Sequence, residues 1–189
     1  KRTNVQTSIS TQQETDPNSF YYYTSNASSG KNRGLNLDLN LNPSNDLNLN
    51  FNMGLLKTQI DSYQYYSNDT ILVIMPEREA AHAPSYTFSG GFTKKYQDLF
   101  WGLNMEGKNW FYFSDSHNEK SKPYSILNLH VGKKINSNIK VSLWAKNVLN
   151  TRYSVRGFYF ILEPDKWTNK LYTIYGEPLS IGVTFNYNL

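Results

Sequence analysis

Apolar and polar residues alternate with a period of two along much of this chain. The clearest example is a leucine at every second position from 35 to 41, separated by Asn36, Asp38 and Asn40. After a turn at residues 43–46, a second apolar row runs from Leu47 to Leu55. Because successive side chains of a strand point to opposite faces, this pattern predicts β-strands with one apolar and one polar face.

The alternation recurs, with less purity, along the rest of the chain. It predicts an all-β, antiparallel fold of about eight strands, at residues 3–12, 19–43 (bent or bulged near Ser29–Arg33), 46–61, 84–95, 98–113, 122–134, 138–149 and 178–189. In the last strand, one face is expected to look toward membrane lipid, and it carries Ile181, Val183, Phe185, Tyr187 and Leu189.

The predicted connections alternate between short and long. Turns at 43–46, 95–98 and 134–138 are short, whereas the connections at 12–19, 62–83, 113–122 and 150–177 are longer. Outer-membrane barrels combine short periplasmic turns with longer extracellular loops in this way. Aromatic residues cluster near the expected strand ends, as they do at membrane interfaces, although ordinary sheet packing also favours aromatic residues.

A soluble β-sandwich would also alternate, but two features favour a transmembrane barrel. The predicted strands exceed the usual ~5–6 residues of globular strands, and their polar face consists mainly of Asn, Ser, Thr and Gly with few charges. Two alternatives remain open at this point: a soluble or surface-anchored β-sheet binding module of the adhesin type, and a stand-alone eight-stranded outer-membrane barrel.

The composition narrows the class further. Mean hydropathy is −0.61, and no run approaches the ~18 apolar residues of a membrane-spanning helix. The net charge of +4 is spread along the chain, which argues against a nucleic-acid partner. Cysteine is absent, which excludes disulfide bonds and thiolate metal sites. The sequence begins at Lys1 without the signal peptide that an outer-membrane protein needs, so we expect the start of the protein to be missing.

No constellation of catalytic residues is recognisable, so an enzyme is not expected. His82, His117 and His130 lie on separate segments without metal-site spacing, and we predict no metal site and no cofactor. His130 has polar-face parity, which favours a hydrogen bond inside a barrel. The run Asp115–Glu119 lacks the glycine of a calcium loop, so a solvated loop is the better interpretation.

Residues 124–189 carry several recognisable pieces in order. They are Ser125–Gly132, Val141–Asn150, Arg152-Tyr153, Arg156–Phe160, Tyr175–Pro178 and the final strand, preceded upstream by Tyr23–Ala27, Gly30–Leu35 and Ala81–Pro84. As an ensemble they resemble the TonB-dependent outer-membrane receptors. Two departures are Leu189, where the family usually ends in Phe or Trp, and Asn147-Val148-Leu149, where it usually reads Asn-Leu-Phe.

The resemblance implies a fold and a function. Residues 1–189 would be the C-terminal part of a 22-stranded barrel domain in the outer membrane of a Gram-negative bacterium, with the plug domain and the early strands missing. The protein would be a siderophore-receptor-like wall for uptake of a scarce nutrient, most commonly a ferric siderophore. Expected partners are outer-membrane lipid, the plug, the TonB-ExbB-ExbD system acting through the plug, and the barrel-assembly machinery that recognises the last strand.

Ligand contacts are expected from the outer loops and the upper inner wall. Candidates in the loop 150–177 are Arg152, Arg156, Tyr159, Trp167, Tyr172 and Tyr175. Arginine can pair with anionic ligands and stack on aromatic rings, which would suit acidic siderophore complexes. The alternative is that these residues pack the loop against its neighbours. Arg78 is expected to be a locally ion-paired loop residue.

Overall fold

The computed structural model describes residues 2–12, 20–67, 71–115, 118–160 and 170–188. Within these ranges the chain forms twelve strands: β1 (Arg2–Gln12), β2 (Phe20–Ser44), β3 (Leu47–Ile60), β4 (Tyr63–Ser67), β5 (Ile71–Met75), β6 (Tyr86–Tyr96), β7 (Leu99–Lys108), β8 (Tyr124–Lys134), β9 (Ile139–Lys146), β10 (Ser154–Phe160), β11 (Lys170–Tyr175) and β12 (Ser180–Tyr187). No helix that could cross a membrane is found in this part of the chain.

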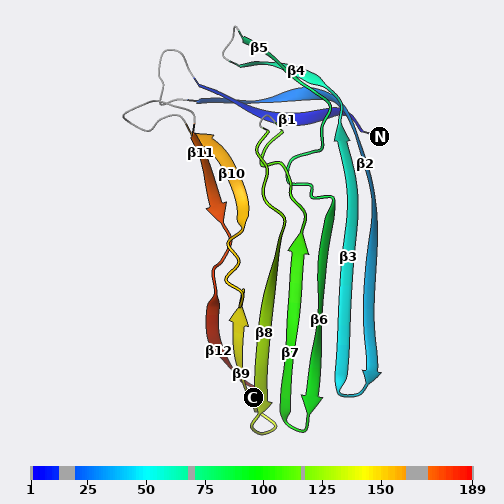
Figure 1. The fold of residues 1–189 in the computed structure, drawn as a ribbon, viewed down its shortest axis with the longest axis vertical. Helices are drawn as coiled ribbons and strands as arrows, with labels where there is room; N and C mark the ends of the chain where they lie inside the picture. Colours follow the sequence, from blue (N-terminus) through cyan, green and yellow to red (C-terminus); the bar gives the residue numbers. More distant parts are fainter. Residues whose placement is uncertain (1, 13–19, 68–70, 116–117, 161–169, 189) are drawn as a thin grey trace.

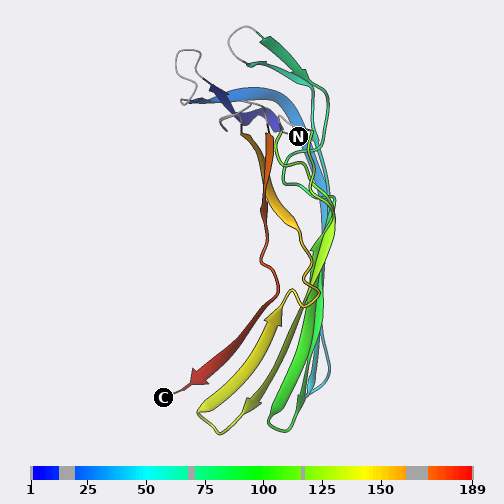
Figure 2. The ribbon, with the colours of Figure 1, turned by 60° about the vertical axis from the view of Figure 1, so that its left-hand side comes forward.

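Eight strands form one antiparallel sheet, in the order β1-β2-β3-β6-β7-β8-β9-β12. These are the eight strands that the alternation predicts, so the predicted all-β, antiparallel fold is confirmed. The sheet is long and curved, and β1 and β12 are its two edges, which are not paired with each other in the described chain (Figures 1 and 2). These eight strands therefore do not close into a barrel of their own.

The connections differ at the two ends of the sheet. Three tight turns, β2–β3, β6–β7 and β8–β9, lie at the end that also holds the C-terminus, which we call the turn end (Figure 1). The longer connections lie at the opposite end, the loop end. Two of them contain hairpins that the sequence pattern did not predict, β4–β5 and β10–β11. The predicted strand 98–113 is also too long, because β7 ends at Lys108.

The predicted bend of the long second strand is present. Its upper part turns across the loop end (Figure 2). Gly30 lies opposite both Arg2 of β1 and Ile60 of β3, so the bend falls where β2 exchanges one partner for the other. The register shift of β2 is elsewhere, between Leu41 and Ser44 beside the tight turn.

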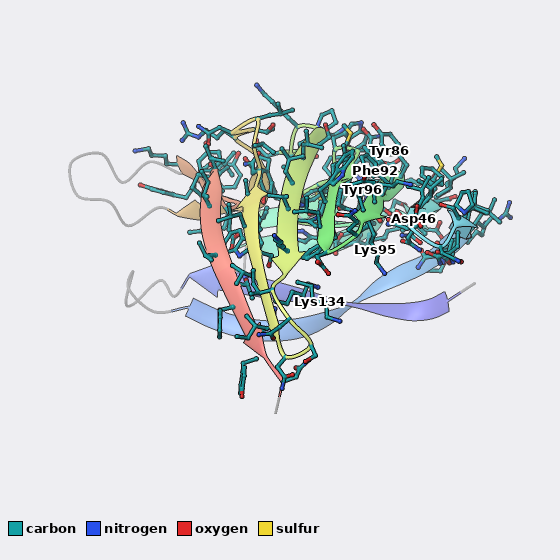
Figure 3. All side chains as sticks on the ribbon, turned by 90° about the horizontal axis from the view of Figure 1, so that it is seen from below. Asp46, Tyr86, Phe92, Lys95, Tyr96 and Lys134 are labelled. Atoms are coloured by element: carbon teal, nitrogen blue, oxygen red, sulfur yellow. The ribbon has the colours of Figure 1, made fainter. Side chains whose placement is uncertain are left out.

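The cross-strand register gathers the apolar positions on one face of the sheet. Leu35 lies opposite Leu55 and Leu39 opposite Phe51, and the side chains of Leu35 and Leu39 are 65% and 43% exposed. Viewed from the turn end, Tyr86, Phe92 and Tyr96 lie on this apolar face, whereas Lys95 and Lys134 lie on the opposite, concave face (Figure 3).

The buried apolar residues that are described lie at the loop end rather than between the long strands. Ile60, Tyr63 and Met75 form a cluster against which Val73 and Ala80 pack. Phe111 and Phe113, also buried, meet edge to face at 5.8 Å. The long strands therefore stand side by side through backbone hydrogen bonds and keep their apolar face uncovered.

Candidate functional site

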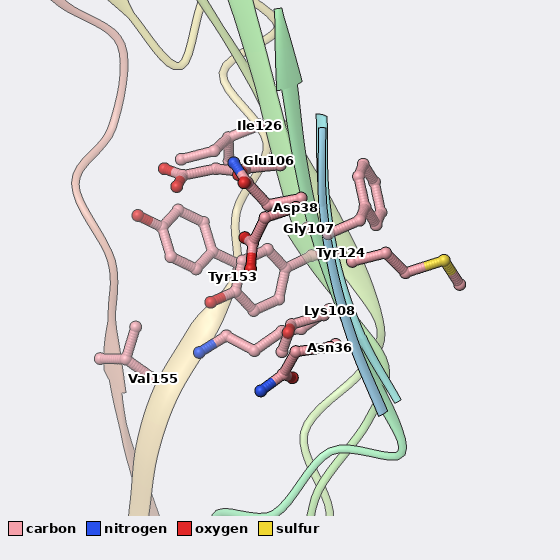
Figure 4. A pocket seen from close by; sticks show the side chains of 15 residues that line it. Asn36, Asp38, Glu106, Gly107, Lys108, Tyr124, Ile126, Tyr153 and Val155 are labelled. Carbon is pink, nitrogen blue, oxygen red and sulfur yellow. The ribbon is translucent and has the colours of Figure 1, made fainter. Parts of the chain in front are cut away.

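A pocket opens on the polar, concave face of the sheet near the loop end. Its volume is about 650 Å³, and the segment after β9 closes it on one side (Figure 4). The lining residues come from six strands and that segment: Asn36, Asp38, Asn52, Met53, Gly54, Thr87, Phe88, Ser89, Glu106, Gly107, Lys108, Tyr124, Ile126, Tyr153 and Val155. We call this the inner-wall pocket.

Strand register explains why these residues meet. One row across the sheet consists of Asp38, Asn52, Ser89, Glu106 and Ile126, each opposite the next. The Nδ2 of Asn52 donates a hydrogen bond of 3.1 Å to the Oγ of Ser89. Since all these positions have the polar parity of their strands, they project to the same side.

The adjacent row adds a cation and an aromatic pair. Lys108 lies opposite Tyr124, and its Nζ is 5.5 Å from the centre of the Tyr124 ring. The rings of Tyr124 and Tyr153 are 4.3 Å apart. Asp38, Glu106 and Lys108 therefore bring both signs of charge to one pocket, beside two phenol groups (Figure 4). Such a lining can hold a polar ligand through several hydrogen bonds at once.

Partial burial raises the pKa of the Tyr153 phenol, and the nearby Tyr124 raises it further. Gly176 allows the ring to lie where it does, because a Cβ at position 176 would come 2.0 Å from Cζ of Tyr153. The Gly176 amide also donates a 2.9 Å hydrogen bond to the Tyr153 carbonyl oxygen. The residues before β10 and the residues after β11 are thus joined to each other beside the pocket.

Asn147 anchors the same segment. It is 1% exposed, and its Nδ2 donates to the carbonyl oxygens of Thr151 at 2.9 Å and Glu177 at 3.0 Å. Its Oδ1 accepts a hydrogen bond from the Thr151 amide at 2.9 Å. Leu149, in the position where the family usually has Phe, is 66% exposed. The departure from the usual triplet therefore falls on an exposed side chain and leaves the buried amide unchanged.

Two of the predicted ligand residues are in contact with each other. The Arg152 guanidinium lies 4.0 Å from the centre of the Tyr175 ring. A hydrogen bond with Thr173, together with the charge of Arg152, lowers the pKa of the Tyr175 phenol. Both side chains are exposed, so this cation–π pair presents a positive group on the surface of the loop end.

The β10–β11 hairpin divides the other candidates between its two faces. Arg156 and Phe158 share a face with Ile174 and Tyr172, their partners across the hairpin. Tyr159 is on the opposite face with Gly157, which packs so closely on Phe113 that a Cβ would be 2.5 Å from its ring. A hydrogen bond to Glu119 raises the pKa of Tyr159. Tyr159 thus packs against the neighbouring connection, and Trp167 lies outside the described residues.

Arg78 differs from the local loop residue that was expected. It is 8% exposed, and its guanidinium donates to Oδ1 of Asn118 at 3.3 Å and to the carbonyl oxygen of Ser114 at 3.2 Å. It also lies 3.9 Å from the centre of the Tyr112 ring. Arg78 therefore ties its own connection to the one between β7 and β8, about 40 residues away in sequence.

The histidines remain apart in the structure. His82 packs 5.3 Å from the Phe111 ring, and His130, on the polar face, lies 6.2 Å from Phe100. His117 is outside the described residues. No group of three or more potential metal-ligating side chains occurs in the part of the chain that is described.

A family model decides the class of protein. The model described as "TonB dependent receptor-like, beta-barrel" matches residues 1–148. The chain belongs to the TonB-dependent receptor family. Members of this family are transporters rather than enzymes and are found in the outer membrane of Gram-negative bacteria. No curated protein matches the sequence.

Solved structures with the same fold include other TonB-dependent receptors. The siderophore receptor PiuA from Acinetobacter baumannii superposes with a TM-score of 0.71 at 15% identity, over 96% of this chain and 25% of its own. The ferric yersiniabactin receptor FyuA from Yersinia pestis gives 0.67 at 14%, over 87% and 24%. The copper transporter OprC gives 0.68 at 12%, over 96% and 28%. The present receptor chain thus spans about a quarter of their length.

The membership removes the soluble-module alternative, and the exposed leucine row agrees with it. What sequence reasoning missed in this receptor chain is the set of charges on the inner wall, Asp38, Glu106 and Lys108. A signal for them was present, because each is an ionisable residue at a polar-face position of a strand whose other polar positions are mostly uncharged.

Proposed function

We propose that this chain forms part of the wall and outer loops of an outer-membrane receptor that takes up a ferric siderophore. The observation that carries the proposal is the separation of the two sheet faces. The apolar face is exposed along its length, from Leu35 to Leu41 on β2 and at Ile181, Val183, Phe185 and Tyr187 on β12. The concave face holds the polar pocket.

This separation suits a wall between lipid and water. Exposed apolar rows of this extent would be unfavourable in water, since the hydrophobic effect favours burial by roughly 25 cal/mol per Å². Against hydrocarbon they are stable, and every strand of a closed barrel finds a backbone partner. The open edges at β1 and β12 would then pair with further strands of a larger barrel, of which residues 1–189 form the C-terminal part.

In this arrangement the loop end faces the outside and the turn end faces the periplasm. Short turns on the periplasmic side are typical of outer-membrane barrels. The inner-wall pocket would then lie on the path of an incoming ligand, below Arg152 and Arg156. The plug domain of the complete receptor would fill the lumen and couple it to TonB-ExbB-ExbD, and the barrel-assembly machinery would recognise the last strand, β12.

The ligand class follows from charge and from the related proteins. Arg152 and Arg156 are exposed cations at the loop end, and guanidinium groups bind carboxylates or catecholates of anionic complexes through paired hydrogen bonds. Several structures with this fold are named as siderophore receptors, which supports an iron complex over other nutrients.

The test uses the complete receptor in a Gram-negative strain that lacks its own siderophore receptors. Uptake of radioactive iron is measured with ferric enterobactin and with ferric yersiniabactin, and radioactive copper(II) is a third arm. We expect uptake of at least one iron complex, abolished by a protonophore. Uptake of copper alone would show that the transported nutrient is copper and not an iron complex. Uptake that the protonophore leaves unchanged would contradict energisation through TonB.

A further inference from the structure

Three cations lie together on the apolar face, at its loop-end margin. Arg33 of β2 is directly opposite Lys57 of β3, and Lys31 is opposite Gln59. The next pair toward the turn end is Leu35 with Leu55, so the cations continue the leucine row on the same face. These four polar side chains line a cavity of about 120 Å³. We call Lys31, Arg33 and Lys57 the margin cluster.

Among the described residues, no acidic side chain forms an ion pair with the margin cluster. All three side chains are exposed, and none of them forms a hydrogen bond or ion pair within the described residues. The nearest acid beyond Gln59 is Asp61, whose carboxylate accepts hydrogen bonds from Ser29 and Gln59. Like charges directly opposite each other across two strands are destabilising, so an anion from outside the chain would relieve Arg33 and Lys57.

The turn-end margin of the same face contrasts with this arrangement. There Lys94 forms an ion pair with Asp46, with 3.1 Å between Nζ and Oδ2. The chain itself therefore neutralises that cation at the turn end. Lys133, also on this face at the turn end, lies opposite Leu99 as a single cation without an ion pair. At the loop end, three cations stand together in adjacent pairs, and none of them has an ion pair among the described residues.

The position of the margin cluster matches a membrane boundary, an argument that rests on the proposed function. Leu47 and Leu55 enclose eight residue steps of β3, or about 27 Å along the strand at ~3.4 Å per residue. Because the strands of an outer-membrane barrel are tilted by about 40°, this length covers roughly 21 Å of an apolar band that is about 25 Å tall. Lys57 follows two residues after Leu55, so the margin cluster lies where lipid headgroups of the outer leaflet begin.

We propose that Lys31, Arg33 and Lys57 bind the phosphate group of a lipid headgroup in the outer leaflet. The Arg33 guanidinium can donate a pair of parallel hydrogen bonds to two phosphate oxygens, while the ammonium groups of Lys31 and Lys57 attract the phosphate as point charges. Gln59, whose Nε2 donates to Oδ1 of Asp61 at 3.3 Å, lines the same cavity. The leucine row below the cluster would lie against the acyl chains of the same lipid.

The test compares lipid affinity of the complete receptor in phosphatidylcholine nanodiscs, measured by native mass spectrometry with added diphosphorylated lipid A. The variant K31Q/R33Q/K57Q removes the margin cluster, and the variant K94Q/K95Q/K133Q removes the same charge at the turn end. We expect the first variant to bind lipid A weaker by about tenfold or more and the second to bind as the unchanged receptor does. Equal loss in both variants would overturn the proposal.

Two further arms identify the ligand chemistry. Dephosphorylated lipid A should bind the unchanged receptor and the variant K31Q/R33Q/K57Q equally. Inorganic phosphate should compete only weakly with lipid A, and efficient competition by inorganic phosphate would contradict a lipid site. The conservative variant R33K keeps the positive charge and should therefore retain part of the affinity for lipid A. Iron uptake is measured in parallel. Normal iron uptake together with equal lipid A binding by all variants would refute the lipid site and leave the proposed receptor function standing.

Discussion

The side-chain amide of Asn147 donates a hydrogen bond to the carbonyl oxygen of Glu177, 30 residues further along the chain. This bond joins the end of β9 to the segment that leads into β12, across the base of the β10–β11 hairpin. Together with the bonds to Thr151, it holds the segment that carries Tyr153 in place at the inner-wall pocket.

Replacing Asn147 by Asp should destabilise the receptor by about 1–3 kcal/mol, because the carbonyl oxygens of Thr151 and Glu177 lose their donor and face a buried carboxylate instead. Asn150 provides a matched control. Its Oδ1 only accepts a hydrogen bond, from the Leu179 amide at 3.1 Å, and an aspartate can do the same. Both residues have positive φ angles, 49° and 48°, which Asp tolerates as Asn does. Thermal unfolding of N147D and N150D measures the difference, and equal midpoints would contradict the assigned donor role.

The apolar face predicts a strong asymmetry between neighbouring positions of β2. Leu39→Arg should reduce the stability of the barrel in a bilayer by about 2–4 kcal/mol, since it places a charge on the lipid side near mid-membrane. Asn40→Arg, one residue away on the concave face, should be tolerated better. The yield of folded receptor in the outer membrane, measured by heat-dependent gel mobility, tests both. Equal tolerance at the two positions would mean that the apolar face does not meet lipid.

The exposed arginines of the loop end should contribute directly to ligand affinity. Removing the charge of Arg156 with R156Q should weaken binding of ferric enterobactin by about tenfold, if the complex forms a charge-assisted hydrogen bond there. R152Q should act similarly and also lose the cation–π contact with Tyr175. K133Q, at the turn end, is the control. Equilibrium binding to the complete receptor distinguishes them, and unchanged affinity in both arginine variants would exclude these residues as ligand contacts.

Two tyrosines at the loop end should give opposite pH dependences. The pKa of Tyr153 is raised above its ordinary 10.0, so its contribution to stability is present below pH 10 and is lost as the pH rises through the folded pKa. The pKa of Tyr175 is lowered, so its contribution is present above pH 10 and is lost as the pH falls through the folded pKa.

Melting temperatures at pH 9 and pH 11 check both signs. Relative to Y153F, the unchanged receptor should lose stability between these pH values, and relative to Y175F it should gain stability. Effects of the same sign in the two comparisons would show that the two phenols do not meet the surroundings described for them.

The long strands could be predicted because a single physical pattern controls them. One face of each strand is apolar and the other polar, so the eight strands of the sheet appear directly as a period of two. The short hairpins lack this pattern. Residues 71–75 of β5 are all apolar, and in β10 a register irregularity between Ser154 and Arg156 interrupts the alternation. Neither hairpin could be predicted from periodicity.

The candidate site was predictable only in part. Arg152 and Tyr175 could be chosen as residue types that bind anions or rings, but their mutual contact spans 23 positions of sequence and depends on the hairpin between them. Asp38 and Glu106 could have been singled out as charges on a polar face, yet only the register across β2, β3, β6 and β7 brings them to one row. Arg78 was misjudged because its partners are on another connection.

The location of the buried apolar cluster also determines which agents unfold which part of the molecule. Ile60, Tyr63 and Met75 are buried together at the loop end. Urea should weaken this cluster, because urea solvates the apolar groups that opening of the cluster would expose. The long strands instead present their apolar side chains outward, and their integrity depends on the surrounding amphiphile. Removal of detergent should therefore destabilise the long strands first, and the loop-end cluster would then lose the support that it receives through Ile60 at the end of β3.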